Sequence, residues 1–411
     1  RGQDEAFTML AGLVVDAQGA ASRTVMWRLA RLAEPLLRDG RWDTSVAIVR
    51  SALLAEADHN DPEHPGIMRD TPERRELRSL LLSLPAFDQR FLGLPLASRA
   101  EAEQALASTP VRTIDPRGYR IVPLSALYCL GRHRQIVDDL EWSLADSVER
   151  GWLLPVVSSS AFISRSLCVL GDHDGSDAAL ARANDAMSRV RETSNAAFQT
   201  MAAQLLRAVV RGTRVPSDEL GPLLPFVELP DTSWSGLAVR AGYARSLGIE
   251  GRQDLAVEAL APVIEVLDVV PGYAVNYPLI VAYCIDALWA LDCTEGLDAL
   301  ERNLREKVVD PDVRYPEVDG RWSMALVCAL TGRVEEAEHW FGEARRVMIE
   351  QETMPLLVAI NLDEAIMWER IGGADALAKA RTLVAQARAG IDHPAMEPWL
   401  ARIDDVATRI R

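Results

Sequence analysis

The sequence predicts an all-α fold in which about nine helix pairs, with a period of about 40 residues, stack into one α-solenoid. Three observations in the 411 residues lead to this prediction. A short motif recurs where helices are expected to end, the residues after it repeat a size pattern, and prolines recur at nearly the same interval.

The recurring motif is an apolar helical stretch that ends in glycine, followed by a short polar turn and a second amphipathic stretch. Its clear copies lie about 40 or about 80 residues apart, at Gly131, Gly171, Gly251, Gly332 and Gly372. The doubled intervals predict two degenerate copies, at Gly212 and around Asp292. We expect each copy to be the turn inside one helix pair.

The helix after each turn carries a stripe of small, large and small residues. After Gly332 these residues are Ala337, Phe341 and Ala344. Spacings of four and three residues place them on one helix face, where small side chains let the neighbouring helix approach and the large one fills the groove. Such a helix must pack on neighbours, as in a solenoid.

Prolines mark the other end of the repeat. Pro278, Pro316, Pro355 and Pro394 are separated by nearly equal intervals of about 40 residues. Proline is tolerated in the first helical turn, where its missing N–H has no partner to lose. We expect these prolines to open the first helix of each pair.

The chain is expected to form a single right-handed superhelical domain over residues 1–411. Its expected segments are N-terminal helix pairs over 1–57, a polar connector over 58–73, a degenerate unit over 74–120, regular repeats over 121–212, a proline-rich interruption over 213–236 and regular repeats over 237–411. Because the chain begins at Arg1 within a helical pattern, we also expect it to be a segment of a longer protein.

Composition narrows the possible functions. With 60 acidic and 44 basic residues the formal net charge is −16, which disfavours autonomous binding to nucleic acid or anionic lipid. The longest apolar stretch, 278–293, is too short to span a membrane and contains Asp286. The five cysteines are odd in number and form no C-x-x-C, which indicates reduced core residues of a cytoplasmic protein.

Catalytic and cofactor motifs are missing from the sequence. It contains no phosphate-binding loop of the G-x-x-x-x-G-K-[ST] type, no G-x-S-x-G elbow, no H-E-x-x-H and no dinucleotide fingerprint. We therefore expect no catalytic residue, no metal ligand and no cofactor, and we do not expect an enzyme.

The size pattern after the turn resembles the second helix of the tetratricopeptide repeat, although the period is longer than the 34 residues of that family. Residues 329–403, which begin ALTGRVEEAEHWFGEARRVM, resemble the C-terminal superhelical region of STAND-type signalling ATPases. That group includes maltotriose-responsive LuxR-type activators and ATPase-linked nucleotide cyclases of actinobacterial type. The resemblance implies a sensory arm that binds a small effector or a protein partner and controls an ATPase or output domain of the same chain.

The candidate site residues follow from the repeat geometry. If each pair packs like a tetratricopeptide unit, its first helix lines a concave groove, and the residues 10, 6 and 3 positions before the turn face inward. Three charged and three aromatic residues occupy such positions: Arg165, Arg245, Asp286, Tyr128, Trp289 and Trp322. Charges in apolar helices are costly unless they face a wet groove or a partner. The aromatic residues would offer flat faces to a sugar, a peptide or a nucleobase.

The alternative for these residues is structural, with the charges forming ion pairs between neighbouring repeats and the aromatic rings filling the core. For function, we expect a non-catalytic sensor or protein-interaction module of a larger cytoplasmic signalling or transcription-regulatory ATPase. Two other functions stay open. One is an all-α enzyme with a central cavity, which would require ring closure and acid pairs that converge on one cleft. The other is a free-standing scaffold that binds acidic peptides.

Overall fold

The computed structural model describes residues 130–151, 153–189, 194–221, 234–269, 277–307 and 319–411, together with Leu127 and Leu224. The chain divides into two compact units, Arg1–Ala126 and Leu127–Arg411, and all described residues belong to the second unit. The segments expected over 1–57, 58–73 and 74–120, and the candidate residue Tyr128, lie outside the described residues.

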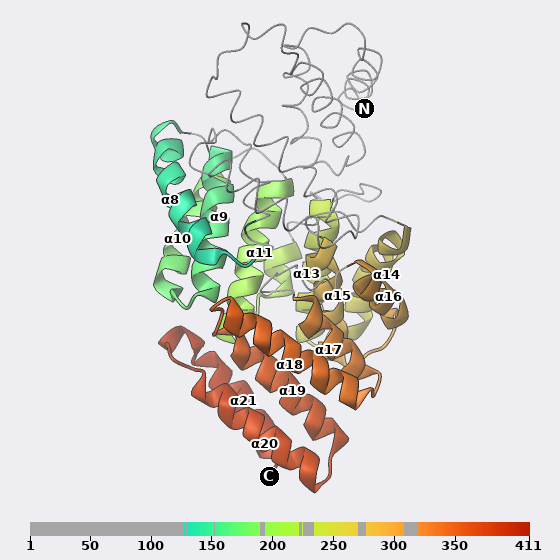
Figure 1. Cartoon of the computed structure of the whole chain (residues 1–411). Coiled ribbons are helices and arrows are strands. Elements are labelled where there is room, and N and C mark those ends of the chain that lie inside the picture. Colours follow the sequence, from blue (N-terminus) through green and yellow to red (C-terminus); the bar gives the residue numbers. More distant parts are fainter. Residues whose placement is uncertain are drawn as a thin grey trace, which may run out of the picture. The chain divides into compact units, whose positions relative to one another are not determined.

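The regular elements of this part of the chain are helices (Figure 1). In order they are α8 (His133–Glu149), α9 (Leu153–Val169), α10 (His173–Ser188), α11 (Ser194–Arg211), α12 (Ser217–Leu220), α13 (Trp234–Ile249), α14 (Gln253–Val269), α15 (Tyr277–Leu291), α16 (Leu297–Lys307), α17 (Gly320–Leu330), α18 (Val334–Glu350), α19 (Leu356–Ile371), α20 (Ala374–Ala389), the short 3₁₀ helix η5 (Pro394–Met396) and α21 (Pro398–Arg409). Consecutive helices pack against one another, so the expected all-α solenoid of helix pairs is confirmed for the described residues.

The expected turn residues lie at the bends between paired helices. Gly171 separates α9 from α10, Gly251 separates α13 from α14 and Gly332 separates α17 from α18, with φ angles of 88°, 73° and 72°. In this left-handed region glycine has no Cβ to clash with the backbone. Asp292 adopts the same conformation, with φ 52°, after α15, as is tolerated for a short polar side chain.

The expected stripe on α18 lies in the core. Ala337, Phe341 and Ala344 on α18 have no exposed surface, and burial of a phenylalanine side chain stabilises a fold by about 1.5 to 3 kcal/mol. Among the marker prolines, Pro278 lies in the first turn of α15 and Pro355 caps α19, as expected for residues that open first helices.

The pair with Gly212 at its turn is irregular. Its second helix, α12, has only four residues, whereas α10, α14 and α18 have 16 or 17. It lies inside the stretch 213–236, where the sequence concentrates prolines. The first helix of this pair, α11, is regular and packs against both α9 and α13.

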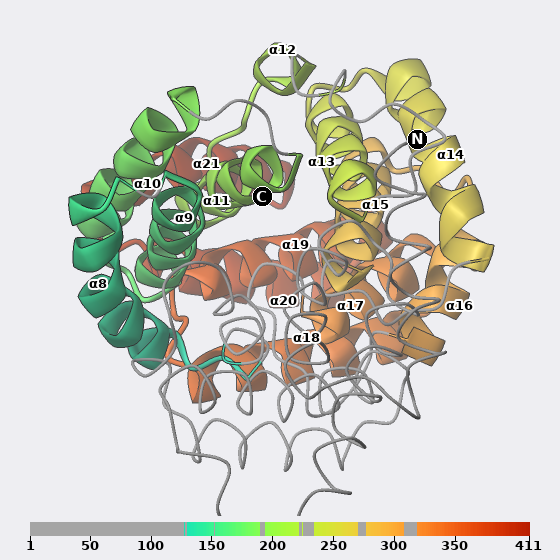
Figure 2. The ribbon, with the colours of Figure 1, turned by 90° about the horizontal axis from the view of Figure 1, so that it is seen from above.

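The last helices of the unit contact helices near its beginning. The Trp399 indole Nε1 donates a hydrogen bond of 2.8 Å to the Val210 carbonyl oxygen, across 189 residues of sequence. The His173 and His393 rings lie 4.6 Å apart between centroids, and Arg134 forms a 2.7 Å ion pair with Glu352. Figure 2 shows α8 to α11 on one side and α13 to α16 on the other, with α19 running between these two groups. The repeat pattern does not predict this return contact, because it depends on curvature accumulated over several pairs.

The described cysteines are free thiols. Cys168, Cys284 and Cys328 are buried within helices, and Cys293 is half-buried. This agrees with their expected place in the core. Among the described helices, none combines the length and the apolar character needed to cross a bilayer.

Candidate functional site

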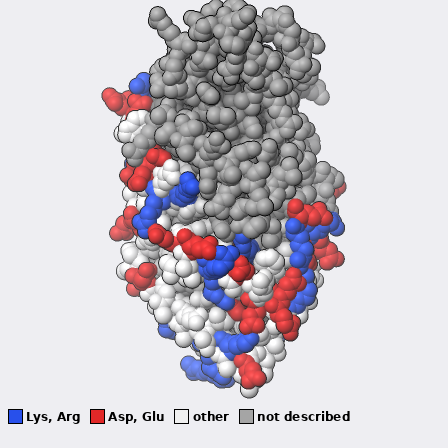
Figure 3. Space-filling view, in the orientation of Figure 1, with Lys and Arg blue, Asp and Glu red and all other residues white. Residues whose placement is uncertain are grey.

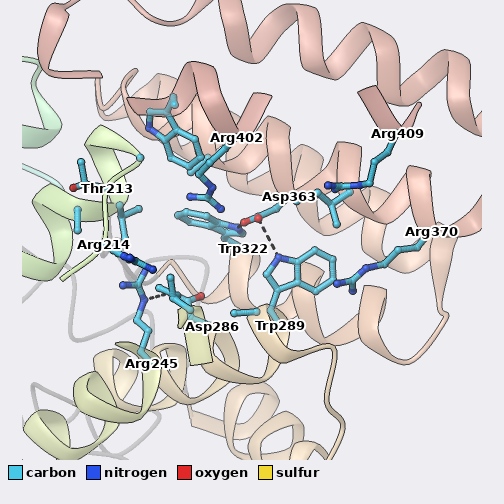
Figure 4. A pocket seen from close by; sticks show the side chains of 18 residues that line it. Thr213, Arg214, Arg245, Asp286, Trp289, Trp322, Asp363, Arg370, Arg402 and Arg409 are labelled. Carbon is cyan, nitrogen blue, oxygen red and sulfur yellow. Dashed lines mark hydrogen bonds and ion pairs between the residues drawn. The ribbon is translucent and has the colours of Figure 1, made fainter. Parts of the chain in front are cut away.

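First helices of successive pairs surround a cavity of about 710 Å³ (Figure 4). Its lining comes from α11 and the three residues that follow it, and from α13, α15, α17, α19 and α21, whereas no second helix contributes. A cavity of this size holds a small organic molecule.

Four of the six candidate residues lie around this cavity, namely Arg245 on α13, Asp286 and Trp289 on α15, and Trp322 on α17. Residues that lie six and three positions before the turn in neighbouring pairs therefore line the same cavity. Trp322 lies ten positions before its turn.

Arg165 does not reach the cavity. It is only 1 % exposed within α9 and its guanidinium lies 5.6 Å from the centre of the Phe162 ring. The reason is position in the array, because α9 packs between α8, α10 and α11, and the cavity begins at α11.

Arg245 and Asp286 form an ion pair between neighbouring helix pairs. The Arg245 Nε donates to Asp286 Oδ2 at 2.9 Å, and Arg245 is 7 % exposed. Burial raises the pKa of Asp286, and the Arg245 guanidinium opposes that rise. The ion pair between neighbouring repeats, which is the structural alternative for these charges, is therefore present. Both side chains also line the cavity.

Asp363 on α19 lies at the centre of the polar network. Its Oδ1 accepts a 3.0 Å hydrogen bond from Trp289 Nε1, and its Oδ2 accepts a 3.1 Å hydrogen bond from Trp322 Nε1. Burial raises the pKa of Asp363 to about 6, an effect that the Arg402 guanidinium partly opposes. Two tryptophans from different helices are therefore oriented by one carboxylate.

Sequence reasoning missed Asp363 because the inward offsets were not counted from the last turn, Gly372-Gly373. Asp363 lies ten positions before Gly373, as Trp322 lies ten positions before Gly332. The available signal was a carboxylate inside the otherwise apolar stretch LLVAINLDEAIMW. Sequence reasoning also missed Arg402, since α21 is not followed by a turn glycine in residues 410–411 from which to count.

Arginines dominate the charge of the cavity. Five arginines and two aspartates line it: Arg214, Arg245, Arg370, Arg402, Arg409, Asp286 and Asp363. Arg402 stacks on the Trp399 ring at 4.4 Å, and Arg370 stacks on the Trp289 ring at 4.2 Å. Positive charge is thus in excess in the cavity of a chain whose net charge is −16.

The lining offers recognition groups and few reactive ones. Guanidinium groups bind oxyanions through paired hydrogen bonds, and tryptophan rings offer flat apolar faces. Among the described residues that form the lining there is no serine, cysteine or histidine. No group of three or more metal-binding side chains occurs among the residues described here.

The chain was compared with known proteins. No family model matches it, and no curated protein matches it.

The raised pKa of Asp363 predicts a distinct pH dependence of stability. The folded state binds the Asp363 proton more tightly than the unfolded state, so the free energy of unfolding rises as pH falls from about 7 to about 4. Relative to Asp363→Asn, the wild type should gain up to about 3 kcal/mol over this range. Chemical denaturation of both proteins at several pH values measures the difference.

The exposed Glu335 provides the control for loss of one negative charge, as Glu335→Gln. A difference between the wild type and Asp363→Asn that stays constant from pH 4 to pH 7 would contradict the raised pKa.

Proposed function

We propose that this unit is a non-catalytic sensor module of a larger cytoplasmic signalling protein, and that its cavity binds a small effector. The observation that carries the proposal is the set of charged side chains held inside apolar helices around an open cavity. Charged groups in a core are costly unless paired or solvated. More than a third of the surface of Arg402 is exposed, although burial lowers its pKa. A side chain that faces an internal hollow has both properties.

The resemblance of residues 329–403 to the superhelical arm of STAND-type ATPases supports a place in signalling or transcription regulation. In such a protein the effector would act on an ATPase or output domain of the same chain. The described part of the lining has no serine, cysteine or histidine, which also favours binding over catalysis.

The cavity walls suggest how binding would be transmitted. They include residues at and after the end of α11 and residues of α21, and these two helices are joined by the hydrogen bond from Trp399 to the Val210 carbonyl oxygen. A ligand that contacts both walls binds more tightly when α11 and α21 are in contact than when they are apart. Only such differential affinity can shift a conformational equilibrium.

The experiment is a thermal-shift screen of the full chain against small metabolites, with one cavity-filling variant. Ala290 lines the cavity at an exposed position, so Ala290→Trp should fill part of the cavity without disturbing the core. A compound that stabilises the wild type should lose its effect in Ala290→Trp.

The matched control is Ala378→Trp, which places the same ring on the exposed face of α20, outside the cavity lining. This variant should respond like the wild type. If every stabilising compound still acts on Ala290→Trp, the cavity is not the effector site.

The second candidate is a hydrolase, because Asp286 and Asp363 line one cavity and the pKa of Asp363 is about 6. Paired carboxylates with separated pKa values perform acid–base hydrolysis in other folds. Here, however, Asp286 is engaged by Arg245, and both oxygens of Asp363 accept tryptophan N–H groups. Turnover of p-nitrophenyl glycosides that disappears in Asp363→Asn would favour this candidate over the sensor.

A further inference from the structure

We infer that the effector is an oxyanion with a flat apolar body, held through its carboxylate or phosphate by Arg402 and Arg214. The inference rests on the proposed function, because it assigns a ligand class to the same cavity. Three observations support it: some of the lining arginines already have carboxylate partners, the tryptophan N–H groups are engaged, and the two remaining arginines come from different segments of the chain.

Three of the five lining arginines have carboxylate partners. Arg245 pairs with Asp286 at 2.9 Å, Arg370 with Asp292 at 2.8 Å and Arg409 with Glu369 at 2.6 Å. Arg402 and Arg214 have no ion pair and no hydrogen bond with the described residues. These two guanidinium groups are therefore the ones that a ligand can engage without breaking an existing pair.

The two available cations are placed differently. Arg402 stacks on Trp399, burial lowers its pKa, and the Asp363 carboxylate, whose oxygens are engaged by two indole N–H groups, opposes that shift. Arg214, three residues after the end of α11, is exposed. Arg402 on α21 and Arg214 in the segment after α11 line the same cavity (Figure 4). An oxyanion between them would compensate the charge of Arg402 and bind as a bidentate partner.

Carboxylates of the cavity do not offer an equivalent site for a cationic ligand. Asp286 is paired with Arg245, and each oxygen of Asp363 accepts an indole N–H. The positive excess is also local. In the described part of the face shown in Figure 3, basic and acidic side chains are interspersed rather than gathered by sign. The cavity thus favours anions within an acidic protein.

The apolar body of the ligand is inferred from the tryptophans. The indole N–H groups of Trp289 and Trp322 are engaged by Asp363, and that of Trp399 by Val210. The N–H groups of these rings are therefore not available to a ligand, and Trp289 and Trp322 keep 8 % and 7 % of their surface exposed. Cations already stack on Trp289 and Trp399, whereas within the described residues no cation or aromatic ring stacks on Trp322. A flat ring of the ligand would stack on Trp322.

Isothermal titration calorimetry on the full chain tests the inference with two matched pairs of probes. AMP is compared with adenosine, and indole-3-acetate with indole-3-acetamide, so that each pair differs in its anionic group. At least one anion should bind about tenfold or more tightly than its neutral counterpart, which corresponds to one charge-assisted contact. Preference for AMP would indicate a phosphate ligand, and preference for indole-3-acetate a carboxylate ligand.

Two variants test the cations. Arg402→Gln and, separately, Arg214→Gln should weaken the anion by about tenfold and leave its neutral counterpart unchanged. Arg214 is exposed, so Arg214→Gln keeps the test valid if Arg402→Gln fails to fold. Arg388→Gln, on the exposed outer side of α20, is the matched control and should bind like the wild type.

Equal binding of an anion and its neutral counterpart would overturn the inference, as would failure of both anions to bind. If neutral probes bind and Ala290→Trp abolishes that binding, the cavity still binds ligands and only the anion assignment fails. If Ala290→Trp changes no binding, the proposed function fails with it.

Discussion

Replacing Trp399 with alanine should lower the free energy of unfolding by about 3 to 5 kcal/mol and open the contact between α21 and α11. Trp399 is 2 % exposed and donates its indole N–H to the Val210 carbonyl oxygen at 2.8 Å. Truncation leaves both a large cavity and an acceptor without its donor. Because Trp399 also lines the effector cavity, ligand affinity should fall together with stability.

Hydrogen exchange distinguishes local opening from a general loss of stability. In Trp399→Ala the amides at the end of α11 and around η5 should exchange faster than those of α13 and α15. Trp142→Ala, on α8, is the control, since this ring is 55 % exposed and its loss should cost at most about 0.5 kcal/mol. Uniform acceleration across all described helices would show that Trp399 does not hold a separate contact.

The fold could be predicted where its determinants are local. A turn glycine such as Gly332, with φ 72°, and the stripe around Phe341 act within one helix pair, so their spacing in the sequence suffices. Gly248 is a different case. A Cβ there would lie 2.8 Å from the Ala287 carbonyl oxygen, so α13 and α15 approach closely at this position. The sequence shows the glycine but not the neighbouring backbone that requires it.

The return of α21 to α11 lies beyond such reasoning, because the angle between successive pairs is set by side-chain packing and accumulates along the array. The site shares this limit. Arg245 and Asp286 were found because they occupy equivalent positions in successive first helices. Arg402 reaches the cavity through the return contact, whereas Arg165 occupies an equivalent position before the cavity begins.

Variants of the ion pair between Arg245 and Asp286 separate the contribution of the pair to stability from its contribution to ligand binding. Asp286→Leu alone should lower the free energy of unfolding by about 3 kcal/mol, since it leaves the nearly buried Arg245 without its partner. The double variant Arg245→Met with Asp286→Leu should recover stability to within about 1 kcal/mol of the wild type, because buried pairs can be replaced by apolar residues of similar volume. Chemical denaturation of the wild type, both single variants and the double variant gives the coupling energy.

The same four proteins connect this pair to the ligand. In the proposed arrangement Arg402 and Arg214 bind the anion, so a stable double variant should keep its preference for the anionic probe over the neutral one. A double variant that regains stability yet loses this preference would move the binding role to Arg245. A double variant no more stable than Asp286→Leu would contradict the structural account of the pair, since the unpaired Arg245 charge would then not be the source of the cost.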